Sequence, residues 1–191
     1  DLGNTGTGGA LSDTDTVSIT VSAVNDTPTN TVPGSQTVNE DTALIFSSAN
    51  GNLISVADAD AGSSAVRVTL TASNGTLTLN STSGFTFTAG DGTSDATMTF
   101  SGTLTNLNNA LAGLRFNPTA NYTGAASVQI VTNDLGNTGT GGALADTDTV
   151  SITVSAVNDT PTNTVPGSQT VSEDAVLIFS SANGNLISVA D

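Results

Sequence analysis

Residues 16–38 spell TVSITVSAVNDTPTNTVPGSQTV, and the same 23 letters return at residues 149–171. Within this stretch Val17, Ile19 and Val21 alternate with Ser and Thr, which predicts a strand with one buried face. The run NDTPTNTVPG that follows contains two prolines and is typical of a linker between folded units. The chain is therefore predicted to contain, twice, a strand that ends one domain and a linker that leads into the next.

The recurrence extends well beyond this stretch. Residues 1–58 match residues 134–191 at an offset of 133 positions, with differences only at Ser12/Ala145, Asn39/Ser172, Thr42/Ala175 and Ala43/Val176. A period of this length is typical of a whole domain rather than of a solenoid unit. We expect residues 1–26 to be the C-terminal strand of a preceding repeat, residues 27–159 to be a complete repeat, and residues 160–191 to be the first strands of the next. Neither flank is expected to form a core alone.

Alternation with a period of two dominates the complete repeat. It predicts strands near residues 66–71, 77–79, 85–88, 97–100 and 128–132, separated by turn sequences. Many short strands at this spacing predict an all-β fold, as an antiparallel β-sandwich. Leu104, Leu107 and Leu111 break the pattern, because their helical spacing predicts one short helix near residues 104–112 that ends near Gly113. We expect this helix to close one end of the core.

Composition excludes several classes of function. The chain has no His and no Cys, its two basic residues are both Arg, and its formal net charge is −15. A Ser-His-Asp triad, a thiol nucleophile, a Schiff-base lysine and an ordinary zinc site are therefore excluded, and we expect no enzymatic activity. So acidic a chain is repelled by nucleic acid and by anionic membranes, and no apolar run approaches the ~20 residues that span a bilayer. Nucleic acid and membrane insertion are not expected.

The acidic residues are concentrated at strand ends and in loops. Clustered Asp and Asn oxygens suit Ca²⁺, which takes about 6–8 oxygen ligands. Asp and Asn also favour turns through local hydrogen bonds, which is the alternative interpretation. The Gly-rich stretch 133–149, flanked by Asp134 on one side and by Asp146 and Asp148 on the other, is a further candidate cation site, as is the pair Asp91 and Asp95.

Three acidic motifs follow one another in order: AVNDTP at 23–28, VNED at 38–41 and VADADAG at 56–62. This order resembles the calcium-binding junction between successive cadherin domains. The stretches 104–124 and 131–142 resemble the cadherin-like and proteoglycan-type tandem repeats of giant bacterial surface adhesins, the type I-secreted RTX adhesins. The resemblance implies an Ig/cadherin-like antiparallel β-sandwich in a tandem array.

The resemblance also implies which residues bind Ca²⁺. The N-terminal junction of the complete repeat would use oxygen ligands from the linker and from the loop near residue 59, namely Asn25, Asp26, Asp58 and Asp60. The C-terminal junction would use the equivalent ligands and the end of a first strand, namely Glu40, Asn158, Asp159 and Asp191. The sequence departs from cadherins in that it lacks a D-R-E-like element. Asp134, or the pairs Asp13/Asp15 and Asp146/Asp148, would take the place of that element.

These observations favour a structural role. We expect an extender or stalk repeat of a long, calcium-stiffened bacterial cell-surface adhesin or fibre, outside the cell, whose partners are the adjacent repeats of the same chain. A spacer gains length from near-identical copies of one domain, whereas a unique binding site would not need to be copied. The alternative is a multivalent binding module or a self-assembling surface filament, directed at polysaccharide, at ice or at further copies through lateral or head-to-tail contacts. A regular ladder of Thr side chains on one face would favour that alternative.

Overall fold

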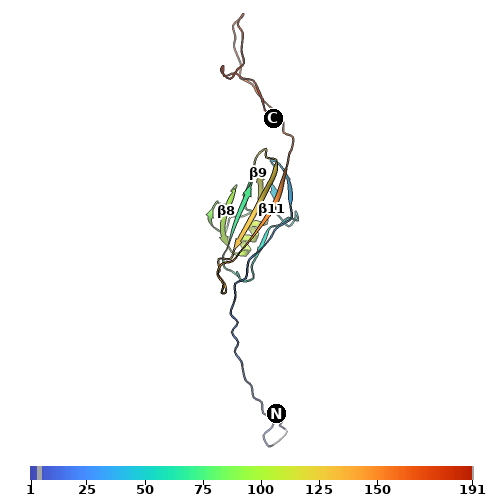
Figure 1. Ribbon diagram of the computed structural model, residues 1–191, viewed down its shortest axis with the longest axis vertical. Coiled ribbons are helices and arrows are strands. Elements are labelled where there is room, and N and C mark those ends of the chain that lie inside the picture. Colours follow the sequence, from blue (N-terminus) through green and yellow to red (C-terminus); the bar gives the residue numbers. More distant parts are fainter. Residues whose placement is uncertain (4–5, 191) are drawn as a thin grey trace.

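The computed structural model describes residues 1–3 and 6–190. Its regular structure is mostly β-strand, with one short helix in the described residues, as the sequence predicts for an all-β chain. Figure 1 shows a folded central part, an extended N-terminal segment leaving one end and a narrow C-terminal segment leaving the other. The two flanks therefore lie at opposite ends of the long axis.

The largest sheet has six strands. Their order across the sheet is β2 (Gln36–Asn39), β11 (Ala145–Ser155), β10 (Gly124–Asn133), β5 (Val66–Ser73), β8 (Thr97–Gly102) and β7 (Thr86–Ala89). Neighbouring strands are antiparallel except β2 and β11, which run parallel. Strand β11 contains the second copy of TVSITVS, and its Val150, Ile152 and Val154 are only 1–2% exposed. The alternation in this copy thus marks a core-facing strand.

Smaller sheets complete the fold. Strands β3 (Leu44–Ile45), β9 (Arg115–Pro118) and β6 (Gly75–Thr78) form a three-stranded sheet. Strand β1 (Thr29–Thr31) pairs with β4 (Ser55–Ala57), and β12 (Thr162–Thr164) pairs with β13 (Ser188–Ala190). One hydrophobic core joins the large sheet to the small one and to the helix, and its largest fully buried side chains include Leu70, Met98, Ile130, Phe46 and Phe116.

Helix α1 (Leu104–Leu111) lies where the leucine spacing predicts it. Thr103 caps its first turn, since the hydroxyl accepts a hydrogen bond from the Asn106 amide at 3.4 Å, and Gly113 follows its end at a φ of +114° that disfavours other residues. The Asn108 side chain forms two 2.9 Å hydrogen bonds with the main chain of Val56, one to its N–H and one to its carbonyl. It thus satisfies main-chain groups of β4 that a neighbouring strand would otherwise pair with. No helix in the described residues has the length and apolar character required to cross a membrane.

The N-terminal flank does not form the predicted strand. Val17, Ile19 and Val21 are 82–88% exposed, and described residues 6–22 are in no strand. The reason is the lack of a partner, because the edges of β10 and β2 that would accept this sequence already pair with β11. Residues 17–21 therefore form no strand in this structure, and their assignment to the C-terminal strand of a preceding repeat stays a prediction.

The C-terminal flank keeps local structure without a core. In the complete repeat Asn52 accepts a hydrogen bond from the Ser47 amide at 2.8 Å, and Asn185 accepts the equivalent bond from the Ser180 amide at 2.9 Å. The antiparallel pairing of β1 with β4 recurs as β12 with β13. Burial of the aromatic side chain does not recur, because Phe46 is fully buried whereas its equivalent Phe179 is 44% exposed. Local sequence sets the turns of this segment, but the core is supplied by the rest of a repeat.

Candidate metal centre

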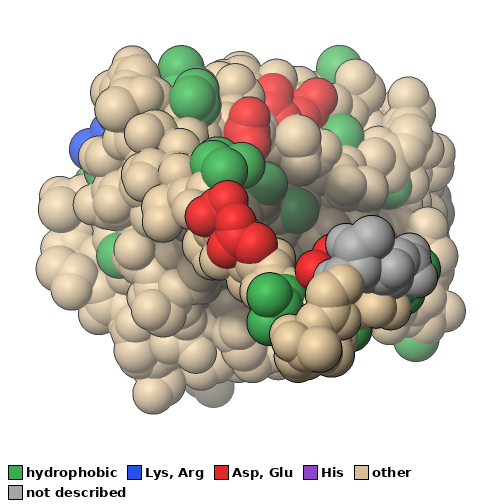
Figure 2. All heavy atoms as spheres, turned by 90° about the horizontal axis from the view of Figure 1, so that it is seen from below, with side chains coloured by type: hydrophobic (Ala, Val, Ile, Leu, Met, Phe, Trp, Pro, Cys, Tyr) green, Lys and Arg blue, Asp and Glu red, His purple; other side chains and the backbone are tan. Residues whose placement is uncertain are grey.

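Four segments bring acidic side chains to the end of the fold where the N-terminal segment enters. Strands β4 and β10 end there, because they run antiparallel to β1 and β11, which begin there. The resulting N-terminal cluster comprises the linker residue and the acids at these strand ends: Asp26, Asp58, Asp60, Asp134, Asp146 and Asp148. Figure 2 views the molecule from this end and shows acidic side chains around the middle of the face, with Lys or Arg visible only at one edge.

The linker and the loop after β4 meet directly. The Asp26 amide donates a hydrogen bond of 2.5 Å to Oδ2 of Asp60. Oδ1 of Asp58 accepts hydrogen bonds from the amides of Asp60 and Ala61, at 2.8 and 2.9 Å. Its second oxygen, Oδ2, is buried and has no hydrogen-bond partner. One oxygen of Asp58 thus stabilises the turn of the D-x-D loop by accepting two main-chain hydrogen bonds. The other oxygen has no hydrogen-bond donor.

Asn25 lies elsewhere than the resemblance implies. Its side chain donates from Nδ2 to Oδ2 of Asp134 at 2.6 Å and to the Gly142 carbonyl at 2.9 Å, rather than joining Asp58 and Asp60. Oδ1 of Asp134 accepts from the amides of Gly136 and Leu144, at 2.9 and 2.8 Å. Burial raises the pKa of Asp134, but these amides and the Asn25 side chain outweigh it, so that the pKa lies below its ordinary value.

Asp146 and Asp148 extend the inward-facing row of β11 beyond the valines of the core. Oδ2 of Asp146 accepts a hydrogen bond from the Asn30 amide at 2.7 Å and so ties β11 to β1. Thr132, on β10, donates to the side-chain oxygen of Asn30 at 2.5 Å, and the side-chain nitrogen of Asn30, Nδ2, is buried without a partner. Sequence reasoning missed Asn30, because nothing in the sequence distinguishes it from the other asparagines of the chain.

Glu40 lies at the opposite end of the fold. Its carboxylate accepts a hydrogen bond from the Val157 amide at 2.7 Å, and its own amide donates to the Ser155 carbonyl at 2.9 Å. The next residues, Asn158 and Asp159, are exposed. Glu40 is thereby beside the linker predicted for the C-terminal junction. Asp191, the remaining residue of that predicted set, lies outside the described residues.

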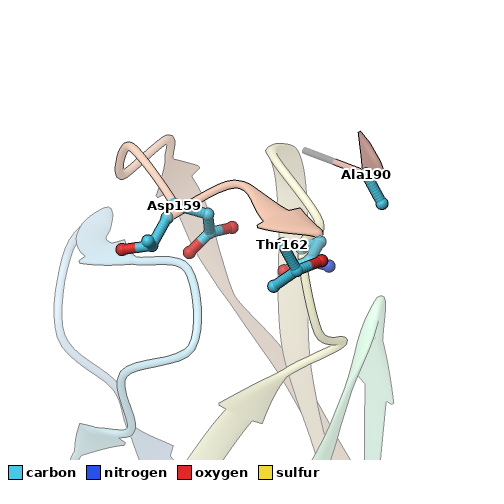
Figure 3. A pocket seen from close by; sticks show the side chains of 5 residues that line it. Asp159, Thr162 and Ala190 are labelled. Carbon is cyan, nitrogen blue, oxygen red and sulfur yellow. The ribbon is translucent and has the colours of Figure 1, made fainter. Parts of the chain in front are cut away.

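A pocket of about 380 Å³ opens at this C-terminal junction. Figure 3 shows Asp159 and Thr162 on the linker and the first strand after it, with Ala190 on the partner strand. The lining contains one carboxylate and otherwise neutral residues: Asn121, Asp159, Thr160, Thr162 and Ala190. One carboxylate at an open pocket is too few ligands to hold a cation by itself.

Elsewhere the turn interpretation accounts for the acids. Oδ2 of Asp95 accepts hydrogen bonds from the amides of Asp91 and Gly92, at 3.0 and 2.8 Å, which is a local loop arrangement. In the described part of the chain, no group of three or more acidic side chains is arranged to hold a metal ion. The N-terminal cluster therefore contains carboxylate oxygens from several segments, but in the described residues they do not form a complete coordination shell.

No protein-family model matches the chain, and no curated protein matches it. Its function is therefore inferred from the repeat, the fold and the cluster.

Asp134 should make stability depend on pH in the acidic range. Its lowered folded pKa means that its contribution is fully present above about pH 4 and is lost as pH falls through the folded pKa. Urea unfolding between about pH 5 and pH 2.5 should show a shallower acid loss of stability in Asp134→Asn than in the unaltered chain. Asp1→Asn is the matched control, since Asp1 is the repeat equivalent in the exposed flank. An unchanged acid slope in Asp134→Asn would contradict this prediction.

Proposed function

We propose that this chain is a structural extender segment of an extracellular bacterial surface adhesin or fibre, stiffened by Ca²⁺ bound between successive repeats. The six- and three-stranded sheets would form the two layers of an Ig/cadherin-like sandwich, repeated in tandem. The proposal is supported by 54 identities across the 58 positions of the recurrence, which suit a copied spacer. The adjacent repeats of the same chain are the proposed partners.

One observation carries the calcium part of the proposal: the buried, unpartnered Oδ2 of Asp58 beside the Asp26–Asp60 contact. A buried carboxylate oxygen without a donor is costly, and a bound cation removes that cost. Ca²⁺ accepts carboxylate, amide and main-chain carbonyl oxygens in a flexible shell. Asp26, Asp58 and Asp60 would supply the first ligands, with Asp146 and Asp148 behind them. Carbonyls and the Glu40 equivalent of a preceding repeat would complete the shell.

Charge explains why such an ion would stiffen the array. The six acids of the N-terminal cluster repel one another and repel the acidic end of a neighbouring repeat. Without a cation this repulsion favours a bent or open junction. Ca²⁺ removes the repulsion and ties the linker residue Asp26 to the loop of Asp58 and Asp60. Extracellular modules bind Ca²⁺ at roughly 10⁻⁴–10⁻³ M, so such junctions fill outside the cell and empty at cytosolic calcium.

Small-angle X-ray scattering tests the spacer directly. A chain of four consecutive 133-residue repeats should show a longer maximum dimension in calcium than in chelator, because each junction straightens. With Asp58→Asn in every repeat, the maximum dimension in calcium should equal the shorter one measured in chelator. An equal maximum dimension in calcium and in chelator would contradict calcium stiffening. An apparent molecular mass that rises with protein concentration would favour self-assembly instead.

A threonine ladder gives the alternative function some support. On the outer face of the large sheet, Thr69 on β5 and Thr99 on β8 share a hydrogen bond of 3.0 Å, and Thr71 and Thr97 approach at 3.5 Å in the next pair. Regularly spaced hydroxyls of this kind suit a flat binding face or a lateral contact between copies. A multivalent or self-assembling surface module is therefore the second candidate.

A further inference from the structure

The linker asparagine at the N-terminal junction is held in a way that the neighbouring linker residues are not. Asn25 is 7% exposed, although Val24 beside it is 65% exposed. Its side-chain amide donates both hydrogens, one to Oδ2 of Asp134 at 2.6 Å and one to the Gly142 carbonyl at 2.9 Å. Both acceptors belong to the Asp134–Leu144 loop, more than a hundred residues away in sequence. The loop therefore accepts a hydrogen bond from each of the two N–H groups of the Asn25 side chain.

The main chain is held at the same place. The Asn25 amide donates to the Thr140 carbonyl at 3.0 Å, and the Thr140 amide donates to the Ala23 carbonyl at 3.1 Å, which forms a parallel bridge. Gly139 permits this approach, because a Cβ there would lie 2.6 Å from the Asn25 nitrogen, and its φ of +76° disfavours side chains. The loop is thus shaped for a close main-chain contact as well as for the amide.

The carboxylate contacts that close this loop occur in both copies of its sequence. In the complete repeat Oδ1 of Asp134 accepts from the amides of Gly136 and Leu144. In the N-terminal flank the equivalent Asp1 accepts from the amides of Gly3 and Leu11, at 2.8 and 3.0 Å. Among the described residues, no equivalent of Asn25 contacts this flank. One carboxylate oxygen therefore makes the local contacts in both copies, and in Asp134 the other oxygen accepts from Asn25.

The second linker shows the undocked state. Asn158 is the repeat equivalent of Asn25, and it is exposed. Its side-chain amide donates only to the carbonyl of the next residue, Asp159, at 3.2 Å. The same linker asparagine is thus buried where it contacts a following Asp–Gly loop and exposed where the described residues contain no such loop.

We propose that the Asp134–Leu144 loop is the receptor for the linker of the preceding repeat, with Asn25 as the recognised residue. The partner is a second copy of this repeat, joined in tandem, and Asn158 would enter the same loop of the repeat that follows. The contact needs no metal ion, so it goes beyond calcium stiffening: it sets the register of each junction, whereas the ion would add stiffness. An amide is required, because a carboxylate at position 25 would face the charged Asp134.

Backbone ¹⁵N relaxation of the whole chain in chelator tests this proposal apart from calcium. Residues 23–26 should show the high heteronuclear NOE values of ordered backbone, and residues 158 and 159, which follow the Val157–Glu40 contact, should show low ones. Asn25→Ala should lower the values at 23–26 to those at 158 and 159, and Asn25→Asp should do the same through repulsion. Asn158→Ala, the matched control, should change neither segment.

A second variant separates the contact from the residue itself. Gly139→Ala leaves Asn25 and Asp134 intact but blocks the approach, and it should also release residues 23–26. Unshifted amide signals from β10 and β11 in each variant would show that the repeat remains folded. Low NOE values at 23–26 in the unaltered chain, or unchanged values in Asn25→Ala, would overturn the proposal. Because calcium is absent throughout, neither result bears on the calcium junction.

Discussion

Addition of Ca²⁺ to the metal-free chain is expected to raise its thermal midpoint in a saturable manner. A ligand that binds only the folded state stabilises it by RT ln(1 + [L]/Kd), which is about 2.7 kcal/mol per site at a hundredfold excess over Kd. For a domain of this size that corresponds to roughly 10 °C. Circular dichroism melts in chelator and then across a calcium series up to about 10 mM would measure the rise, given a Kd near 10⁻⁴ M.

Asp58→Asn is the sharpest variant for this experiment. The replacement amide keeps an oxygen that can accept the hydrogen bonds from Asp60 and Ala61, so the turn is preserved while the charge is removed. It should lose most of the calcium-dependent rise and retain its midpoint in chelator. Asp146→Asn should reduce the rise as well, whereas Asp13→Asn should not, because Asp13 is the equivalent of Asp146 in the exposed flank.

Magnesium supplies the ion control, since its smaller, strictly octahedral shell does not suit a site whose carboxylates come from separate segments. If the unaltered chain melts at the same temperature in chelator and in calcium, the cluster binds no stabilising ion. Its aspartates would then be turn formers, as Asp91 and Asp95 are.

Truncation of Phe46 is expected to have the second large effect. Phe46 is fully buried in the core, and removal of such a ring costs about 3–5 kcal/mol through lost burial and the cavity left behind. Phe179 is its equivalent in an almost identical local sequence but is 44% exposed. Phe179→Ala should therefore change the free energy of unfolding by less than about 0.5 kcal/mol.

Urea unfolding followed by tyrosine fluorescence measures this difference in the complete repeat alone. The chain has one Tyr and no Trp, and Tyr122 lies within residues 27–159, where its hydroxyl donates to the Ala125 carbonyl at 2.6 Å. Phe46→Ala should shift the midpoint strongly and Phe179→Ala should leave it in place. Equal losses in both variants would place the C-terminal flank in the same cooperative unit and would contradict the boundary at residue 159.

Part of the candidate site followed from sequence. The resemblance to the cadherin junction implies the linker–loop contact of Asp26 with Asp60 and the position of Glu40 beside the opposite linker. The pairing of Asn25 with Asp134 did not follow, because it joins residues 109 positions apart through a loop whose shape depends on main-chain hydrogen bonds. The hydrogen bonds of Asn108 with the main chain of Val56 could not be predicted either, because they also join residues far apart in the sequence.

The sequence by itself determined the repeat, the all-β class, and helix α1, because periodicity, capping and turn residues act over a few positions. Only the tertiary structure decided which copy of a sequence becomes a strand. Val17, Ile19 and Val21 stand in the same seven-residue context as Val150, Ile152 and Val154, yet the first set is exposed and the second is buried in β11. A strand makes its hydrogen bonds to other strands, so its existence depends on partners that its own sequence does not contain.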